Sequence, residues 1–330
     1  MSIEPSHEPV LPRETLTALG GALEVGGGYV VDCTLGLGGH AERILEAFPK
    51  ARLLGIDQDL EALELSRQRL ARFGSRVRLQ AGNFRDLRAL TAFLDEPVRG
   101  VLADLGVSSM QLDRGERGFS FRFDGPLDMR MGSTGPTAAD VLSTYSEADL
   151  ERIFKHYGQE RQGRRIARAL VERRETAPLQ TTRQLREAIL AAKGLRSDGA
   201  TPGGWRHREG RVDPATRVFQ ALRIEVNGEL DALESFLDQA IESLEEDGRL
   251  VVISYHSLED RIVKHTLRDR SKGEVDQITG RSLPERRLIE VLTKKPLRPT
   301  PEEVASNPRA RSARLRAARK LRQQERSSRP

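Results

Sequence analysis

The sequence predicts an α/β protein, in which a doubly wound parallel sheet carries an inserted all-helical domain. Three observations predict this class. Strand-like and helix-like segments alternate up to Asp104, helical periodicity alone fills the stretch from there to about Asp213, and a glycine-rich turn follows the first strand. Strands that alternate with helices form parallel sheets with helices on both faces. A chain of 330 residues with 37% hydrophobic residues is long and apolar enough to bury a sizeable core.

Five short segments have the composition of buried strands, with β-branched or leucine-rich centres and mostly with Gly, Asp or Asn beside them. They are Tyr29–Asp32, Arg52–Asp57, Val77–Gln80, Gly100–Asp104 and Leu250–Ser254. The intervals between the first four leave room for helices. Leucines recur at helical spacing in Leu60–Phe73 and in Leu87–Leu94.

The long helical stretch in the middle of the chain predicts an inserted domain. Two capping-box patterns, Ser146 with Asp149 and Thr181 with Gln184, predict helix starts within it. Asp213-Pro214 then predicts the N-cap and first turn of one long helix that runs through Leu244. We therefore predict a sheet domain made of residues 1–113 and 213–308, a helical insert at 114–212 and a basic C-terminal tail at 309–330.

The turn after the first strand has the composition of a nucleotide-binding turn. Its glycines allow positive φ and a close approach of backbone to ligand, and the helix that follows adds the positive end of its dipole. The turn contains Gly36, Gly38, Gly39 and His40. Asp57, at the end of the second strand, follows Gly36 by about twenty positions, the separation at which a carboxylate meets ribose hydroxyls in such units.

The turn leaves the choice of cofactor open. Gly36-x-Gly38-x-x-Ala41 also fits the looser dinucleotide pattern, and the turn could simply pack a strand on a helix. Asp32, four residues before the first glycine, and the paired glycines favour S-adenosylmethionine (SAM), because SAM has no phosphate and needs carboxylates instead. An NAD-linked oxidoreductase would use the same residues but also needs a hydride acceptor site and a proton relay, and residues 100–260 show no such constellation.

The composition argues against a disulfide-bonded, metal-binding, membrane or secreted protein. One cysteine, Cys33, excludes an internal disulfide, and six scattered histidines predict no metal site. Apolar runs are too short for a membrane span, and the N-terminus lacks the pattern of a signal peptide, so we expect a cytoplasmic protein without a membrane partner.

Basic residues are concentrated near the C-terminus. The net charge is +5, yet residues 309–330 alone hold nine Lys or Arg against one acid. This run, and an arginine-rich segment at 161–174, could hold nucleic-acid phosphates, although both could also be solvated surface. Residues 194–212, around Trp205, are predicted as an exposed loop whose basic residues either contact nucleic acid or are simply mobile.

Asp104 ends the fourth strand, where the carboxyl edge of the sheet would bring it beside the first strand. It is therefore the group best placed to meet both the cofactor and the atom to be modified, unless it only caps a helix. The loop Arg117–Met131 that follows is rich in Gly and aromatic residues. Its alternating Phe119, Phe121 and Phe123 could stack on bases or pack against the insert.

Four long motifs together resemble one family. They are Asp104–Asp113, Arg117–Met131, Ile253–Arg261 and Asn307–Arg316, and the likeness runs from His7 to the basic tail. The chain resembles the bacterial 16S ribosomal RNA cytosine-N4 methyltransferases, the MraW family. The resemblance implies a Rossmann-like SAM-dependent methyltransferase whose helical insert recognises substrate. The implied reaction is methyl transfer to the exocyclic N4 of a cytidine in the decoding centre of 16S rRNA, with the small ribosomal subunit as partner.

The resemblance also implies the site residues. Those that match the family's cofactor-binding positions are Gly38, Gly39, His40, Asp57, Phe84, Asp104 and Gln111. The chain departs from the family pattern at Leu37, where a basic residue is common, at Gly132, where an acid is usual, and at Tyr255, where Phe is usual. None of these changes a matched cofactor residue, so they bear only on contacts around the glycine turn and the substrate loop.

Composition also bears on the chemistry of transfer. Methylation at cytosine C5 generally needs a cysteine thiolate, and the single Cys33 lies on the cofactor turn, so an amine target is favoured. The target base must be unpaired and extruded. We expect Asp104 or nearby carbonyls to accept the amine hydrogens, and His256 to orient the base or take the proton, unless His256 only caps the helix after it. A non-catalytic SAM-binding assembly factor is the remaining alternative, and the oligomeric state stays open.

Overall fold

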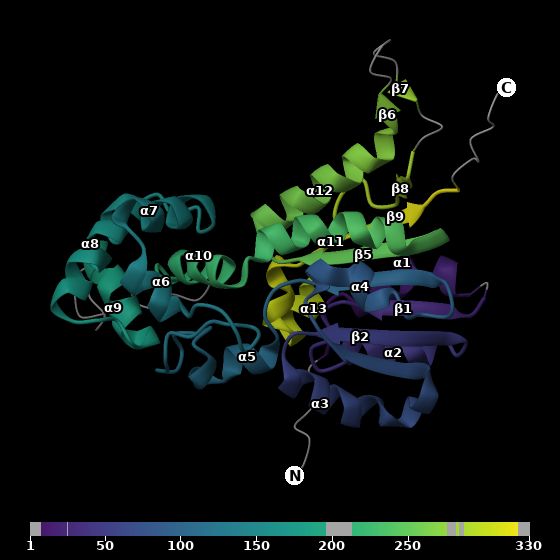
Figure 1. Ribbon diagram of the computed structural model, residues 1–330, viewed down its shortest axis with the longest axis horizontal. Helices are drawn as coiled ribbons and strands as arrows, with labels where there is room; N and C mark the ends of the chain where they lie inside the picture. The colour runs from purple at the N-terminus through teal and green to yellow at the C-terminus, as the bar shows by residue number, and fades with distance from the viewer. Residues whose placement is uncertain (1–7, 25, 196–212, 276–281, 284–286, 323–330) are drawn as a thin grey trace. The chain divides into compact units, whose positions relative to one another are not determined.

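The structure, a computed structural model, describes residues 8–24, 26–195, 213–275, 282–283 and 287–322. It confirms the α/β class and divides into two compact units (Figure 1). The sheet unit comprises Met1–Gly106 and Leu230–Pro330, and the helical unit comprises Val107–Glu229. The helical insert therefore begins earlier and ends later than the predicted range of 114–212.

Within the described residues the sheet unit holds one seven-stranded sheet of order β3-β2-β1-β4-β5-β9-β8. The first five strands are parallel, whereas β9 is antiparallel to both of its neighbours. The bounds are β1 Gly28–Asp32, β2 Ala51–Asp57, β3 Val77–Ala81, β4 Val98–Asp104, β5 Leu244–Ser254, β8 Ile289–Val291 and β9 Arg314–Lys320. A separate pair joins β6 (Glu274–Val275) to β7 (Ser282–Leu283). The five predicted strands are confirmed.

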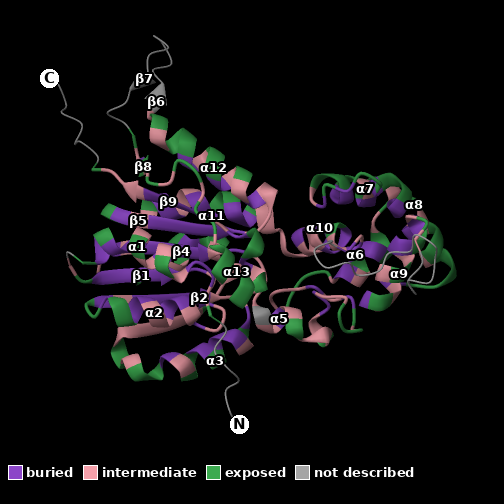
Figure 2. Ribbon diagram, turned by 180° about the vertical axis from the view of Figure 1, so that it is seen from behind, coloured by how far each residue is buried: buried purple, intermediate pink, exposed green. Residues whose placement is uncertain are grey.

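Helices cover both faces of this sheet, and the strands between them are largely buried (Figure 2). Successive residues of a strand point to opposite faces. Val31 accordingly packs in the core formed with α11 and α12, whereas Val30 packs in the core formed with α1 and α2. The helices are α1 Pro12–Leu23, α2 Gly39–Ala47, α3 Leu60–Leu70, α4 Leu87–Thr91, α11 Glu229–Ser243, α12 Ser257–Lys272 and α13 Pro301–Ser306, with 3-10 turns at Ala71–Arg76, Phe84–Asp86 and Pro308–Ser312.

The helical unit is a bundle built around its own apolar core. Its helices are α5 Ser109–Asp113, α6 Ala138–Thr144, α7 Glu147–His156, α8 Gly163–Thr176, α9 Thr182–Ala192 and α10 Thr216–Asn227, with a 3-10 turn at Gly115–Arg117. Both predicted helix starts are confirmed, since Ser146 and Thr181 accept hydrogen bonds from the backbone three residues on. Of the helices described in either unit, none is both long and apolar enough to cross a bilayer.

The prediction of one helix from Asp213 to Leu244 is wrong. Two helices, α10 and α11, occupy this stretch and are separated at Gly228. Gly228 takes φ 56° and ψ 38°, the left-handed conformation in which glycine ends a helix without strain. The division between the two units falls directly after this break.

The prediction of a basic tail at 309–330 is wrong for its central part, because Arg314–Lys320 forms β9 inside the sheet. Three small or apolar side chains of β9, Leu315, Ala317 and Ala318, are buried. Arg316 is also buried and donates to Asp260 at 2.7 Å. The arginines of β9 therefore form ion pairs with acids from distant segments of the chain. A count of charged residues within 309–330 cannot detect these pairs.

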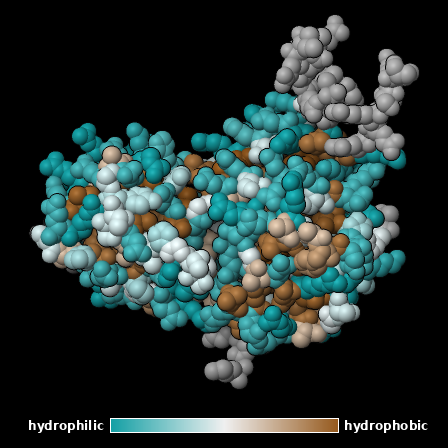
Figure 3. All heavy atoms as spheres, viewed as in Figure 1, coloured by the Kyte–Doolittle hydropathy of each residue, from teal (hydrophilic) through white to brown (hydrophobic). Residues whose placement is uncertain are grey.

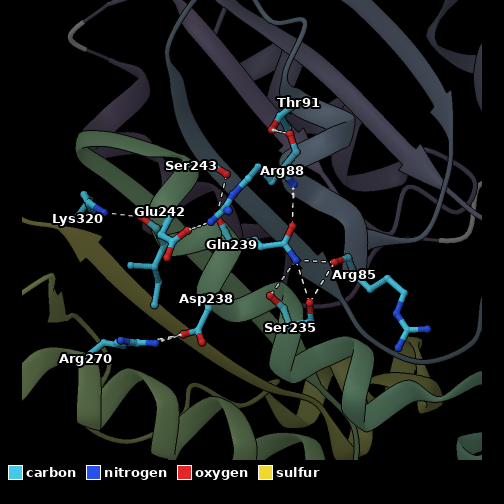
Figure 4. A network of polar contacts seen from close by, with 11 residues as sticks. Arg85, Arg88, Thr91, Ser235, Asp238, Gln239, Glu242, Ser243, Arg270 and Lys320 are labelled. Atoms are coloured by element: carbon cyan, nitrogen blue, oxygen red, sulfur yellow. Dashed lines mark hydrogen bonds and ion pairs between the residues drawn. The ribbon is translucent and has the colours of Figure 1, made fainter.

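A network of polar contacts fixes the turn that precedes α4 (Figure 4). Gln239 of α11 accepts from the backbone N–H of Arg88 at 2.9 Å and donates to the carbonyl of Arg85. The ring of Phe84 meets Phe236 of α11 edge-on, with centroids 5.2 Å apart. The position of Phe84 is thus set by α11 through both polar and aromatic contacts.

Truncation of the C-terminus tests whether Arg314–Lys320 stabilises the sheet as a strand or is a dispensable tail. A chain ending at residue 313 should lose the sheet unit's cooperative unfolding, because β5 loses its neighbour and the partly buried Asp260 loses both of its arginine partners. We expect insolubility or a drop in Tm of more than about 10 °C, given the several kcal/mol involved.

The matched control ends at residue 322 and keeps all of β9. Its thermal unfolding, followed by circular dichroism, should stay close to that of the full chain. Equal melting of the two truncated chains would show that β9 adds nothing to stability.

Candidate active site

Acidic residues end three adjacent strands at the carboxyl edge of the sheet. Asp57 ends β2, Asp32 ends β1 and Asp104 ends β4, and these strands are neighbours in the order β2-β1-β4. The predicted gathering of Asp57 and Asp104 at one edge is therefore seen within the sheet unit.

The glycine turn lies between β1 and α2 and is tied to β2 and α3. Gly36 and Gly38 take φ of 52° and 74°, which L side chains rarely adopt. The N–H of Gly36 donates to Oδ2 of Asp57 at 2.7 Å, and its carbonyl accepts from the hydroxyl of Ser66 at 2.6 Å. A Cβ at Gly38 would lie 3.4 Å from Leu70, which is an ordinary contact, so the positive φ rather than a lack of space favours glycine there.

The Asp57 carboxylate is held by backbone donors on both oxygens. Besides the Gly36 contact, Oδ1 accepts from the N–H of Asp59 at 2.9 Å. Burial raises the pKa of Asp57, and these backbone donors oppose the rise. Each carboxylate oxygen has two lone pairs, so acceptor capacity remains for a hydroxyl of a ligand.

The end of β3 brings Phe84 to the same edge. The N–H of Gly82 donates to the carbonyl of Asp57 at 3.0 Å, and the amide of Asn83 donates to Gln58 at 3.0 Å. The turn that carries Phe84 is thus bonded to the turn that carries Asp57. Phe84 is only partly buried, which leaves part of its ring for a ligand.

Asp104 makes three contacts that fix its position. Its N–H donates to Oγ1 of Thr34 at 2.6 Å, and its Oδ1 accepts from the hydroxyl of Tyr255 at 2.8 Å. Its Oδ2 lies 3.6 Å from Nε2 of His40. Because 24% of the Asp104 side chain is exposed, a ligand can reach it.

His40 is buried, yet its Nε2 has no hydrogen-bond partner among the described residues. The 3.6 Å to Asp104 is too long for a hydrogen bond. Buried polar atoms normally find a partner, so this nitrogen is a candidate contact for a ligand.

Asp32 is the acid that the sequence-based site assignment omitted. It is almost fully buried, and burial raises its pKa from 3.8 to about 7, against the opposing effects of His40 and of the Thr34 N–H, which donates to Oδ1 at 3.2 Å. The signal was present in the sequence, because an acid at a strand end four residues before a glycine turn is placed to line the turn.

His256 is the N-cap of α12. Its Nδ1 accepts from the N–H of Glu259 at 3.4 Å, and its Nε2 lies 3.0 Å from Oε1 of the same residue. Glu259 in return accepts from the N–H of Tyr255 at 2.8 Å. Nδ1 of His256 therefore makes the cap of the helix-cap alternative, whereas Nε2 is buried and has no hydrogen-bond partner among the described residues despite its short distance to Glu259.

Gln111 belongs to the helical unit and is part of a capping box at the start of α5. Its Oε1 accepts from the N–H of Ser108 at 3.0 Å, and its own N–H donates to the Ser108 hydroxyl at 3.2 Å. The other residues of the predicted cofactor set, Gly38, Gly39, His40, Asp57, Phe84 and Asp104, all lie in the sheet unit.

Cys33 follows Asp32 and is buried. Burial, reinforced by the charge of Asp32, raises the pKa of the Cys33 thiol well above its ordinary value. The thiol is therefore protonated at neutral pH and is a poor nucleophile.

The helical unit exposes cations on and just before α8. Arg161, Arg164, Arg165 and Arg173 are exposed, whereas Arg168 pairs with Glu172 at 2.8 Å. The surface of this unit is largely hydrophilic in the view of Figure 3. This geometry suits contact with phosphates, although exposed arginines alone do not identify a ligand.

The three phenylalanines of the 117–131 loop have different environments. Phe119 is buried in the core of the helical unit, and Phe121 packs edge-on against Phe219 with centroids 5.0 Å apart. Phe123 is 56% exposed and is the one that remains available for stacking on a base. The predicted 196–212 part of the loop around Trp205 lies outside the described residues.

Comparison with known proteins identifies relatives over nearly the whole chain. A model of the MraW methylase family matches residues 4–321. Proteins named ribosomal RNA small subunit methyltransferase H are 49% identical in Syntrophotalea carbinolica, over 96% of this chain and 98% of the relative, and 48% identical in Carboxydothermus hydrogenoformans, over 97% and 99%. A solved rRNA methylase from Streptococcus thermophilus aligns with a TM-score of 0.40 at 12% identity, over 93% of this chain and 95% of that one.

The raised pKa of Asp32 predicts a pH-dependent stability. The unfolded carboxyl ionises above pH 3.8 and the folded one only above about 7, so the folded state holds more protons between these values and loses stability as pH rises through them. Above pH 8 the buried ionised Asp32 should lower the free energy of unfolding by on the order of 4 kcal/mol.

Asp32→Asn removes this ionisation. The variant should therefore gain stability relative to the parent protein as pH increases from 4 to 8, measured by denaturant unfolding at each pH. A stability difference that stays constant over this range would contradict the assignment.

Proposed function

The chain belongs to the MraW methylase family, and we propose that it transfers a methyl group from SAM to ribosomal RNA of the small subunit. The proposed acceptor is the exocyclic N4 of a cytidine in the decoding centre of 16S rRNA. The observation that carries the proposal is the pairing of a glycine turn with the Asp104 carboxylate at one edge of the sheet, where donor and acceptor can meet.

The residues at this edge fit SAM. Gly36 and Gly38 hold positive φ in the turn, Nε2 of His40 lacks a hydrogen-bond partner among the described residues, and carboxylates of three strands suit a cationic ligand with ribose hydroxyls. Asp57 would accept the hydroxyls and the exposed part of Phe84 would pack on the adenine. The residues proposed to hold SAM are Gly38, Gly39, His40, Asp57, Phe84, Asp104 and Gln111.

When bound, SAM supplies a methyl carbon activated by its sulfonium. The protein's part in the reaction is to hold the amine in line with that carbon and to accept its hydrogens, since the N4 lone pair is conjugated with the ring. Asp104 can do this because its Oδ2 carries no hydrogen bond from Tyr255, which binds the other oxygen. The amine would give up one proton, which Asp104 or His256 would accept, as its nitrogen gains the methyl group and the carbon–sulfur bond of the donor breaks with the electron pair left on sulfur.

An amine target also agrees with the state of the only cysteine. A transfer to the ring carbon C5 generally requires a thiolate that adds to the base. Burial keeps the Cys33 thiol protonated, so no such nucleophile is present at the site. The N4 position needs only acceptors, which the strand ends supply.

The function is tested by labelled methyl transfer from SAM to small ribosomal subunits taken from cells that lack the enzyme. Mass spectrometry of the digested rRNA should find one new cytidine methylated at N4. A methyl group at C5, or on the ribose, would refute the proposed acceptor atom, and the absence of transfer would refute the function. Equilibrium binding of SAM but not NAD is the accompanying control.

His256 is proposed to orient the base or to take the proton, and its capping contacts provide the competing explanation. Asn is a good N-cap residue, so His256→Asn should preserve the start of α12 whereas His256→Ala should not. If His256 acts in the reaction, both variants should slow single-turnover methylation by about 100-fold. A normal rate in the Asn variant, with SAM binding retained, would leave His256 with the capping role alone.

The exposed arginines of α8 are proposed to hold rRNA phosphates. Arg164→Ala with Arg165→Ala should weaken binding to small subunits and reduce the slope of log K against log salt by about 2, because each phosphate contact releases about one counterion. SAM affinity should not change.

Arg168→Ala is the matched control on the same helix, because Arg168 is engaged by Glu172. A double variant that binds rRNA with the parent protein's affinity and salt dependence would exclude this face of α8 as the contact.

A further inference from the structure

The hydroxyl of Tyr255 is the direct partner of the proposed catalytic carboxylate. Resting on the function proposed above, we propose that Tyr255 is a positioning residue for methyl transfer. Its hydroxyl holds Oδ1 of Asp104, so that Oδ2 is the oxygen presented to the acceptor amine.

The sheet register explains how Tyr255 reaches Asp104. Asp104 at the end of β4 pairs with Ile253 of β5, and Tyr255 lies two residues further along the chain. The backbone of Tyr255 is fixed in turn, because its N–H donates to the buried Glu259 at 2.8 Å. The ring is therefore delivered from a rigid strand end rather than from a loop.

The contact makes the two carboxylate oxygens of Asp104 inequivalent. An aspartate carboxylate has a broad χ2 distribution and would otherwise rotate between similar orientations. Thr34 fixes the backbone N–H of Asp104, and Tyr255 fixes Oδ1 at 2.8 Å. The remaining oxygen, Oδ2, lies on the side of His40 at 3.6 Å and accepts no hydrogen bond from the described residues of the sheet unit.

Tyr255 stays a donor throughout the working range of pH. Burial, together with the charge of Asp104, raises the pKa of Tyr255 well above its ordinary value. A protonated phenol that donates to a carboxylate is a charge-assisted hydrogen bond, which is stronger and shorter than a neutral one. The orientation of Asp104 is consequently maintained at the moment of transfer.

Tyr255→Phe removes the hydroxyl and keeps the ring. At saturating SAM and saturating small subunits, the single-turnover rate should fall about 10-fold, the size expected for loss of one hydrogen bond to a charged group. The Kd for SAM should change less than about 3-fold, because the carboxylate remains present and only its orientation is lost.

Tyr29→Phe is the matched control. Tyr29 is a fully buried tyrosine of the same sheet, and its hydroxyl has no partner in the described part of the chain. It lies in β1 near the amino end of the strand, away from the carboxyl edge that carries Asp104. This variant should transfer methyl groups at the parent rate.

A double-mutant cycle separates positioning from a general structural effect. In Asp104→Ala the acceptor of the Tyr255 hydroxyl is gone, so adding Tyr255→Phe should lower the rate no further. The inference would be overturned if the two substitutions lowered the single-turnover rate independently, so that their fold-changes multiplied in the double variant. A Tyr255→Phe rate within twofold of the parent protein's would overturn it as well.

A spectroscopic measurement tests the contact without any methyl transfer. In protein labelled with ¹³C-tyrosine, the Cζ resonance of Tyr255 is identified as the one that is missing from the Tyr255→Phe spectrum. The chemical shift of this resonance should change in Asp104→Asn. A resonance that does not move overturns the contact. A parent protein that shows the shift but methylates no rRNA would instead refute the proposed function, and the role of Tyr255 in transfer with it.

Discussion

The site depends on one electrostatic constraint, the placement of three carboxyl groups at the ends of adjacent parallel strands. Acids brought together in a partly buried place repel one another and lose hydration. The sheet unit offsets this with donors from its own backbone and side chains, namely the N–H groups of Gly36, Asp59 and Thr34 and the hydroxyl of Tyr255. The remaining unfavourable free energy is retained at Asp32 and Asp57, whose pKa values are both raised by burial. A cationic ligand would relieve it, which is why the edge suits a sulfonium compound.

The features predicted correctly from the sequence are local ones. The five strands were visible as short apolar runs, and the turn at Gly36 and Gly38 was visible because only glycine takes positive φ there without strain. Helix starts at Ser146 and Thr181 were predicted because a capping box lies within four consecutive residues. The ends of parallel strands meet at one edge by topology, so Asp57 and Asp104 could be brought to one edge before any coordinates were known.

The features that were missed depend on partners far away in the chain. Nothing in the sequence around Arg316 indicates its pairing with Asp260, so the charge pattern predicts a basic tail where the structure has β9. The contact of Tyr255 with Asp104 joins residues 151 positions apart, and local patterns carry no information at that range. Asp32 was different, because its position before the turn was noticed but its burial was not. The break at Gly228 also has a local signal, because Asn-Gly within a helical pattern is typical of a helix end. The continuous helical periodicity on both sides nevertheless predicts a single helix.

The location of β9 has a consequence for how the enzyme matures. β5, which leads to Tyr255, is bordered on one side by β4 and on the other by β9, and the Ser254 hydroxyl meets the carbonyl of Arg314, 60 positions later. At ribosomal speeds of 5–20 residues per second, that interval corresponds to about 3 to 12 s of translation. During synthesis β5 therefore has no neighbour on this side until β9 has been made. A fragment released before that point would lack β9 beside the strand that leads to Tyr255. Of the five parallel strands, β5, which leads to Tyr255, is thus the last to gain its full set of neighbours.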